Sequence, residues 1–204
     1  MLLFFDTETT GMVDWHLPTD DSSQPDIVQL AALLLDDDGS ERGCFSGIVN
    51  PGVDIPERIA AIHGITTDIS ARCGLSPVTA LSVFARMMDL ATTIVAHNID
   101  FDISAIQTMA ARHGKGRPFS FEGKVRSCTM KTATPICKIA KPNPRREDDY
   151  KWPKLAECVR IFFGEEFAGA HDALNDVRAC ARVYFHLRSL TETVQAAPQE
   201  NVNQ

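Results

Sequence analysis

The chain begins with an apolar segment that runs directly into two acidic residues. The segment LLFFDTETTG at residues 2–11 places Asp6 and Glu8 on either side of a threonine and then turns at Gly11. Side chains alternate between the faces of a β-strand, so the two carboxylates point the same way, about 7 Å apart along the strand. They are either solvated residues where a strand ends or half of a metal site, and the rest of the chain must decide.

The remaining patterns predict one α/β domain over residues 1–190, with a mixed central β-sheet flanked by helices. The chain has 204 residues and 44% hydrophobic content, which is enough for a substantial core. We expect residues 191–204 to form a disordered tail. Apolar alternation and helical spacing predict strands at 2–9, 27–35, 42–52, 92–98 and near 125, and helices at 56–63, 76–90, 100–114, 129–138, 154–164 and 172–190.

The composition limits the cellular compartments in which we expect the protein. The longest uncharged apolar stretch, residues 27–35, is too short to span a bilayer, and no leader pattern precedes the first strand. The six cysteines show neither a C-x-x-C pair nor zinc-ligand spacing, which predicts buried free thiols in a reducing compartment. We therefore expect a cytoplasmic protein without a membrane partner.

The charge is distributed unevenly. The net formal charge is −7, yet residues 112–154 carry twelve Lys or Arg against four acids. This basic segment is either a solvated loop or a surface for a phosphate-bearing partner. In the second case Tyr150 or Trp152 would stack on a base, and in the first Trp152 would lie in the core. The cations placed to follow a nucleic-acid strand are Lys141, Arg145, Arg146 and Lys151.

Two further segments carry acids at the start of a predicted helix. In AHNIDFDISAI, Asp100 suits a helix cap, whereas Asp102 lies inside the first turn and is left to face another group. In GAHDALNDV, His171 and Asp176 are five residues apart, which would put them on opposite sides of one continuous helix. If Asp172 is the N-cap, His171 precedes the helix and its ring can lie over the helix start, near Asp176.

These acids gain a common role if they meet at one end of the sheet. Asp6, Glu8, Asp102 and Asp176 would then bring together four negative charges that repel one another without cations. Two Mg²⁺ or Mn²⁺ ions prefer such oxygen ligands, and a two-metal carboxylate site is suited to phosphodiester hydrolysis. His171 would take the proton from the attacking water as general base.

The same residues resemble a known family. DTETTG at 6–11, HNIDFD at 97–102 and HDALNDV at 171–177 are similar to the three motifs of the DEDDh, or DnaQ-like, exonucleases, and IHGIT at 62–66 resembles the segment between the first two. The resemblance covers about residues 2–188. It implies a ribonuclease H-like fold and a 3′→5′ exonuclease that releases nucleoside 5′-monophosphates. The histidine five residues before the last Asp selects the histidine subclass over the tyrosine one.

The resemblance also assigns residues. It implies that Asp6, Glu8, Asp102 and Asp176 are metal ligands and that His171 is the general base. The substrate-binding residues that it implies, around the terminal sugar and bases, are Thr9, Thr10, Gly11, His63, Ile65 and Asn98. Thr10 could instead be a turn residue, and His63 a loop histidine with its hydrogen bonds satisfied.

We expect the substrate to be single-stranded DNA with a free 3′ end. The first motif resembles proofreading subunits of bacterial polymerases, and SCTMK at 127–131 resembles stand-alone DNA exonucleases. DNA replication or repair proteins are therefore the expected partners, although no polymerase-binding domain is recognised and a free-standing enzyme is favoured. The alternatives are an exoribonuclease of the oligoribonuclease or tRNA-trimming type and a non-catalytic nucleic-acid-binding module.

Overall fold

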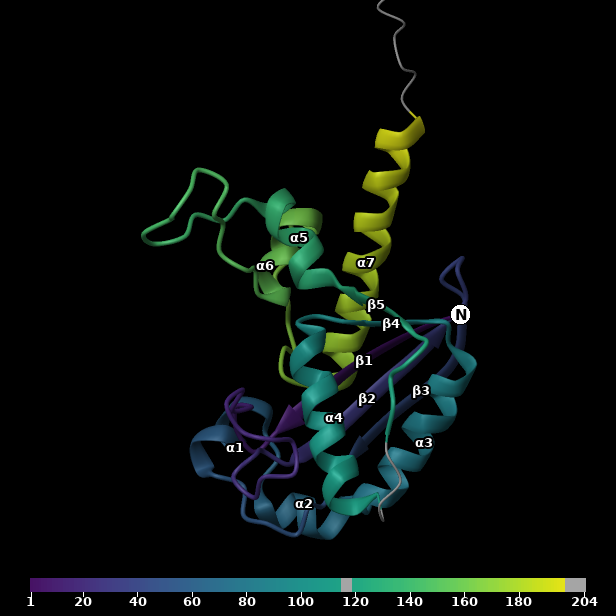
Figure 1. Ribbon diagram of the computed structural model, residues 1–204, viewed down its shortest axis with the longest axis vertical. Helices are drawn as coiled ribbons and strands as arrows, with labels where there is room; N and C mark the ends of the chain where they lie inside the picture. Colours follow the sequence, from purple (N-terminus) through teal and green to yellow (C-terminus); the bar gives the residue numbers. More distant parts are fainter. Residues whose placement is uncertain (115–118, 197–204) are drawn as a thin grey trace, which may run out of the picture.

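The computed structural model describes residues 1–114 and 119–196, which form one mixed sheet with helices on both faces (Figure 1). The strands are β1 (Leu2–Thr9), β2 (Ile27–Leu35), β3 (Glu41–Ile48), β4 (Thr93–Ala96) and β5 (Val125–Cys128). The helices are α1 (Glu57–His63), α2 (Thr67–Cys73), α3 (Pro77–Leu90), α4 (Ile99–His113), α5 (Thr129–Cys137), α6 (Leu155–Phe163) and α7 (Ala173–Ala196). The predicted α/β class and mixed sheet are confirmed.

The strand order is β3-β2-β1-β4-β5, so the first strand of the chain lies at the centre of the sheet. β1 pairs antiparallel with β2, which pairs antiparallel with β3. On its other side β1 pairs parallel with β4, and β4 with β5. Among the residues that the structure describes, β4 pairs with β1 only over Leu2–Phe4, and no strand pairs with the second half of β1 on that side.

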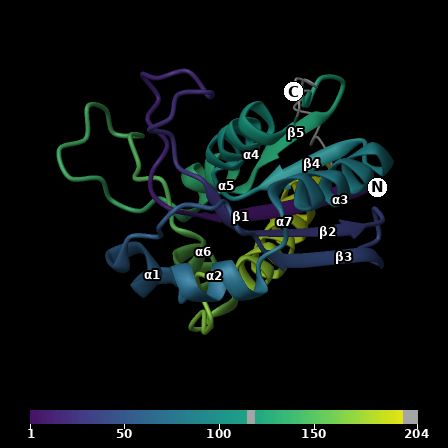
Figure 2. The same ribbon diagram turned by 90° about the horizontal axis from the view of Figure 1, so that it is seen from below.

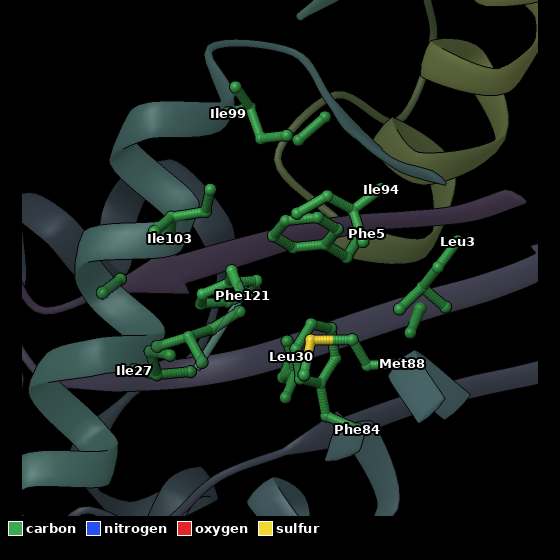
Figure 3. Close-up of a cluster of buried hydrophobic side chains, with 14 of the residues drawn as sticks. Leu3, Phe5, Ile27, Leu30, Phe84, Met88, Ile94, Ile99, Ile103 and Phe121 are labelled. Atoms are coloured by element: carbon green, nitrogen blue, oxygen red, sulfur yellow. The ribbon is translucent and has the colours of Figure 1, made fainter. Parts of the chain in front are cut away.

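The alternation of β1 divides the core into two layers. Leu3 and Phe5 point into the cluster under α3 and α4, where Phe84 and Ile103 also lie (Figure 3). Leu2 and Phe4 belong to the opposite cluster, which is covered by α7 (Figure 2). The first half of β1 therefore packs against α3 and α4 on one face and against α7 on the other, and the acidic residues follow in its second half.

Two helix boundaries differ from the prediction, and one helix was not predicted. Asn98, with φ 72°, is the N-cap position of α4, and Asp100 instead forms an exposed ion pair with Lys131, so the predicted cap at Asp100 is wrong. The seven-residue α2 was not predicted; the Thr66 side chain caps it by accepting from the Ile69 amide. α7 continues to Ala196, past the predicted boundary at 190, and residues 197–204 of the predicted tail lie outside the described residues.

Two expectations from the composition concern membrane-spanning helices and the burial of the cysteines. Within 1–114 and 119–196, no helix has the length and apolar character needed to cross a membrane. All six cysteines are free thiols, but Cys44 and Cys73 are exposed rather than buried. Cys44 lies on β3, an edge strand with little burial on either face, which explains its exposure.

Candidate active site

Asp6 and Glu8 lie in β1 and face the α7 side of the sheet. They share the parity of Leu2 and Phe4, whose side chains pack under α7. The strand does not end before them, because β1 continues to Thr9 with Asp6 opposite Ala31 and Glu8 opposite Gln29 on β2. The two carboxylates are therefore held by a paired strand rather than by a flexible turn.

Asp102 reaches the same place from the opposite layer. It lies in the first turns of α4 and is only 2% exposed. Its Oδ1 accepts two hydrogen bonds from Thr7, one from the backbone N–H at 3.0 Å and one from Oγ1 at 2.8 Å. The Thr7 amide is available because β4 has already left that edge of β1. Thr7 thus fixes one oxygen of Asp102.

His171 and Asp176 meet at the start of α7 as the predicted cap requires. The Asn175 amide donates to Asp172 Oδ1 at 3.1 Å, which confirms Asp172 as the N-cap. His171 precedes it in a left-handed conformation, φ 69°, and its N–H donates to Asp176 Oδ2 at 2.9 Å. Potential ligand atoms of Glu8, His171 and Asp176 all lie within 4.8 Å of one another.

Burial and mutual repulsion raise the pKa values of the four carboxyls. The pKa of Asp6 lies well above its ordinary range. Burial is the largest cause, followed by the charges of Asp102 and Asp176. Burial raises the pKa of Asp102 to about 8 against the opposing hydrogen bonds from Thr7. Burial likewise raises the pKa of Glu8 to about 7 and that of Asp176 to about 6. Hard divalent cations would relieve this repulsion, so the donor set fits the predicted metal ions.

Gln29 is a residue of the site that the sequence analysis missed. It lies on β2 opposite Glu8 and is 7% exposed. Its Oε1 accepts from the Ala173 amide at 3.2 Å, and its Nε2 donates to Asp172 Oδ2 at 3.3 Å. It therefore attaches the start of α7 to the strand beside Glu8. A single amide within the apolar run 27–35 is the signal that could have identified it.

The polar groups of the turn after β1 form hydrogen bonds within the turn and to the backbone of Asp26. Thr9 Oγ1 donates to the Gly11 carbonyl at 2.7 Å. Thr10 Oγ1 accepts from the Asp26 amide at 2.9 Å, and its N–H donates to the Asp26 carbonyl at 2.8 Å. A side chain at Gly11 would meet nothing within 4 Å, so the backbone there borders open space. Both threonines shape the turn, and Gly11 leaves room beside it.

The other three predicted substrate-binding residues occupy different environments. His63 Nδ1 accepts from the Ile65 amide at 3.1 Å, whereas its Nε2 is buried without a partner among the described residues. Burial lowers the pKa of His63, which lies near the Thr9 backbone and His171. Ile65 is 6% exposed and packs with Val28 and Ile55, so it belongs to the core. Asn98 provides the left-handed residue that starts α4.

Much of the predicted basic segment neutralises nearby acids. Arg112 forms a largely buried ion pair with Asp26 at 2.6 Å and holds the loop before β2. Lys141 pairs with Asp149 at 2.9 Å, and Lys151 with Glu157 at 2.6 Å. These pairs reduce the positive charge available to a phosphate backbone. Trp152 is 63% exposed, which excludes the alternative that placed it in the core.

Comparison with solved structures defines the fold of the protein. The zinc-bound complex of E. coli exonuclease I with ssDNA matches at a TM-score of 0.71 and 21% identity, over 95% of this chain and 41% of that chain. Exonuclease X, solved with 5′-overhanging duplex DNA, matches at a TM-score of 0.62 and 21% identity, over 94% of this chain and 93% of that chain. The chain therefore has the ribonuclease H-like fold, as predicted.

The sequence comparisons then identify the family. Residues 3–184 match the RNase T exonuclease family, and the chain belongs to it, as a DEDD-type 3′–5′ exonuclease domain. The DNA polymerase III subunit epsilon-like protein of Rhodobacter capsulatus is 30% identical over 186 residues, 90% of this chain and 23% of that protein. The chain spans only 12% to 26% of the length of the curated relatives that it matches.

Proposed function

We propose that the protein hydrolyses single-stranded DNA from its 3′ end and releases nucleoside 5′-monophosphates. The observation that carries the proposal is the convergence of four carboxyls with raised pKa values and one histidine at the end of β1. The names of similar proteins support the substrate, since exonuclease I was solved with ssDNA and exonuclease X with an overhanging duplex. The epsilon-like relative points to replication or repair proteins as partners.

In this proposal two Mg²⁺ or Mn²⁺ ions are held by the four acids, Asp6, Glu8, Asp102 and Asp176. When bound, such ions would supply an activated water and stabilise the departing oxygen. Thr7 orients Asp102 and Gln29 holds the start of α7, so the ligands are in place before substrate arrives. Thr10 and Gly11 would border the terminal sugar, with His63 beside them.

His171 is the general base of the proposed reaction. Its backbone N–H is fixed by Asp176, while its exposed ring lies at the rim of the acid cluster and is free to turn toward an attacking water. The ring would take the proton of that water as the phosphorus–oxygen bond to the upstream nucleotide breaks.

The His171→Gln substitution should lower kcat by about 10² to 10⁴-fold with little change in KM, because general-base catalysis is lost while the acids remain. Steady-state kinetics on a DNA oligonucleotide measures this. His16→Gln, in the exposed loop after β1, is the control and should stay within about twofold of the wild type. A His171→Gln enzyme of wild-type kcat would remove His171 from the mechanism.

Degradation of matched oligonucleotides tests the proposal as a whole. A 5′-labelled single-stranded DNA should shorten stepwise from the 3′ end in Mg²⁺ or Mn²⁺, yield 5′-monophosphates, and stay intact in EDTA. A phosphorothioate at the 3′ end should block the reaction, and a DNA duplex should react more slowly. Faster loss of the matched RNA would favour the exoribonuclease alternative, and internal cleavage would contradict the exonuclease polarity.

A further inference from the structure

An apolar groove begins at the acid cluster and leads away from it along the start of α6. Its cavity measures about 370 Å³, at the small end of the range for ligand sites. We call it the Trp152 groove and define it by its apolar lining, Met130, Trp152, Pro153, Leu155 and Phe167. His171 and Asp176 close one end. The groove therefore opens directly onto the place where we propose that hydrolysis occurs.

The wall that carries Trp152 is held in place on both sides. The backbone N–H of Lys151 donates to the Ile139 carbonyl at 3.0 Å, and Ala140 forms a β-bridge with Tyr150. His97 contacts the Pro153 carbonyl through Nε2 and Thr129 Oγ1 through Nδ1, each at 2.9 Å. Burial lowers the pKa of His97, and a neutral ring then donates to the carbonyl and accepts from the hydroxyl.

Trp152 presents its ring to solvent from this fixed wall. It is 63% exposed although six other apolar residues line the same groove. A concave groove lined by apolar and aromatic side chains next to a few polar groups is the usual form of a ligand site, and Trp152 lines such a groove beside His171 and Asp176. Phosphate is disfavoured there by the neighbouring carboxylates, whereas the flat face of a nucleobase is apolar and stacks on indole.

We infer that the Trp152 groove binds the base of the nucleotide immediately upstream of the scissile phosphate. This inference rests on the proposed function. In Figure 1 the end of β1 lies between α1 on one side and α6 on the other. The turn at Thr10 and Gly11, with His63 of α1, is proposed to hold the terminal nucleotide, so the α6 side is left to the next one. Lys154, at the rim, places a positive charge beside the upstream backbone.

The groove also explains why the substrate should be single-stranded. A base inserted against Trp152 cannot remain paired, and its contacts are with the ring face rather than with the edges that distinguish bases. The groove is therefore expected to accept any base and to exclude an intact base pair.

Abasic substitution combined with Trp152→Ala tests the assignment. The substrates are dT12 and the same strand with one abasic residue at the second position from the 3′ end. In the wild type the abasic residue should raise KM about tenfold, and Trp152→Ala should raise KM for dT12 by a similar factor with kcat nearly unchanged. In the Trp152→Ala enzyme the abasic residue should not raise KM further, because both changes remove the same contact.

Two variants control this experiment. Trp15→Ala removes the other tryptophan, which is 61% exposed, and should retain the abasic penalty. Trp152→Phe keeps an aromatic face and should retain most of the affinity. In a protein that carries Trp15→Phe and His171→Gln, where hydrolysis is slow, dT12 should quench the Trp152 fluorescence in Mg²⁺, and the abasic strand should quench it less.

The outcomes separate the two proposals. An active Trp152→Ala enzyme with wild-type KM, or a full abasic penalty in that variant, overturns the groove assignment and leaves the exonuclease standing. Equal losses in Trp15→Ala and Trp152→Ala also overturn it, since the effect would then not be specific to the groove. A wild-type protein that degrades neither DNA nor RNA overturns the proposed function, and the groove assignment with it.

Discussion

The Asp6→Asn variant is expected to lose at least roughly 10³-fold of the exonuclease activity and, without metal, to be more stable than the wild type. Asp6 is surrounded by Asp102, Asp176 and Glu8, and its burial and their charges hold its pKa well above its ordinary range. The neutral, isosteric amide removes one of four repelling charges. It also removes a ligand from the proposed cation site, so the stability gain and the activity loss have one cause.

Asp100→Asn is the matched control. Asp100 lies two residues before Asp102 in the same motif, but its carboxylate is half-exposed and pairs with Lys131 on the outside of α4. An exposed ion pair contributes little, so stability and activity should both stay near wild type. The measurements are initial rates on single-stranded DNA and thermal melting in EDTA. An active Asp6→Asn enzyme, or one destabilised in EDTA, would contradict the assignment of Asp6 to a cation site.

The placement of Asp6, Glu8 and His171 was predictable because it follows from rules that act within one strand or at one helix start. Strand alternation places Asp6 and Glu8 on one face, and the cap at Asp172 places His171 before α7. Neither rule needs a contact between distant segments. The structure then shows Glu8, His171 and Asp176 together, as the sequence predicts.

The parts that were missed or wrong depend on tertiary contacts. Thr7 holds Asp102 across 95 residues of sequence, and Gln29 holds Ala173 across 144. The cap of α4 was wrong because Asn98 adopts a left-handed conformation, which leaves Asp100 free to pair with Lys131. The basic segment was overestimated because a charge count cannot show that Arg112 pairs with Asp26, 86 residues away.

The metal-free protein should lose stability as the pH rises from about 7 to about 8.5. Folding raises the pKa of Glu8 from 4.5 to about 7, and those of Asp102 and Asp176 from 3.8 to about 8 and about 6. Between the unfolded and folded values the folded chain binds more protons than the unfolded chain. The free energy of unfolding therefore decreases as pH increases, and this contribution is lost as each folded pKa is passed.

Thermal melting in EDTA across that range measures the slope. The window begins above the lowered pKa values of ion-paired acids such as Asp149 and Glu157, whose protonation would destabilise the protein at lower pH. It also begins above the ordinary pKa of 6.5 of His63 and His97, because their lowered folded pKa values act in the opposite direction at lower pH. The melting temperature should fall by several degrees, since about 1 kcal/mol corresponds to about 2–4 °C for a domain of this size. Asp6→Asn should flatten the slope, whereas Asp100→Asn should not.

Divalent cations should reverse the trend. Mn²⁺ or Mg²⁺ binds the ionised acids, so its stabilisation should be small near pH 5.5 and largest near pH 8.5, where the metal-free protein is weakest. The stabilisation should also grow with cation concentration and disappear in Asp6→Asn. A metal-free protein whose melting temperature rises steadily to pH 8.5, with no response to either cation, would mean that the four carboxyls do not form a cation site.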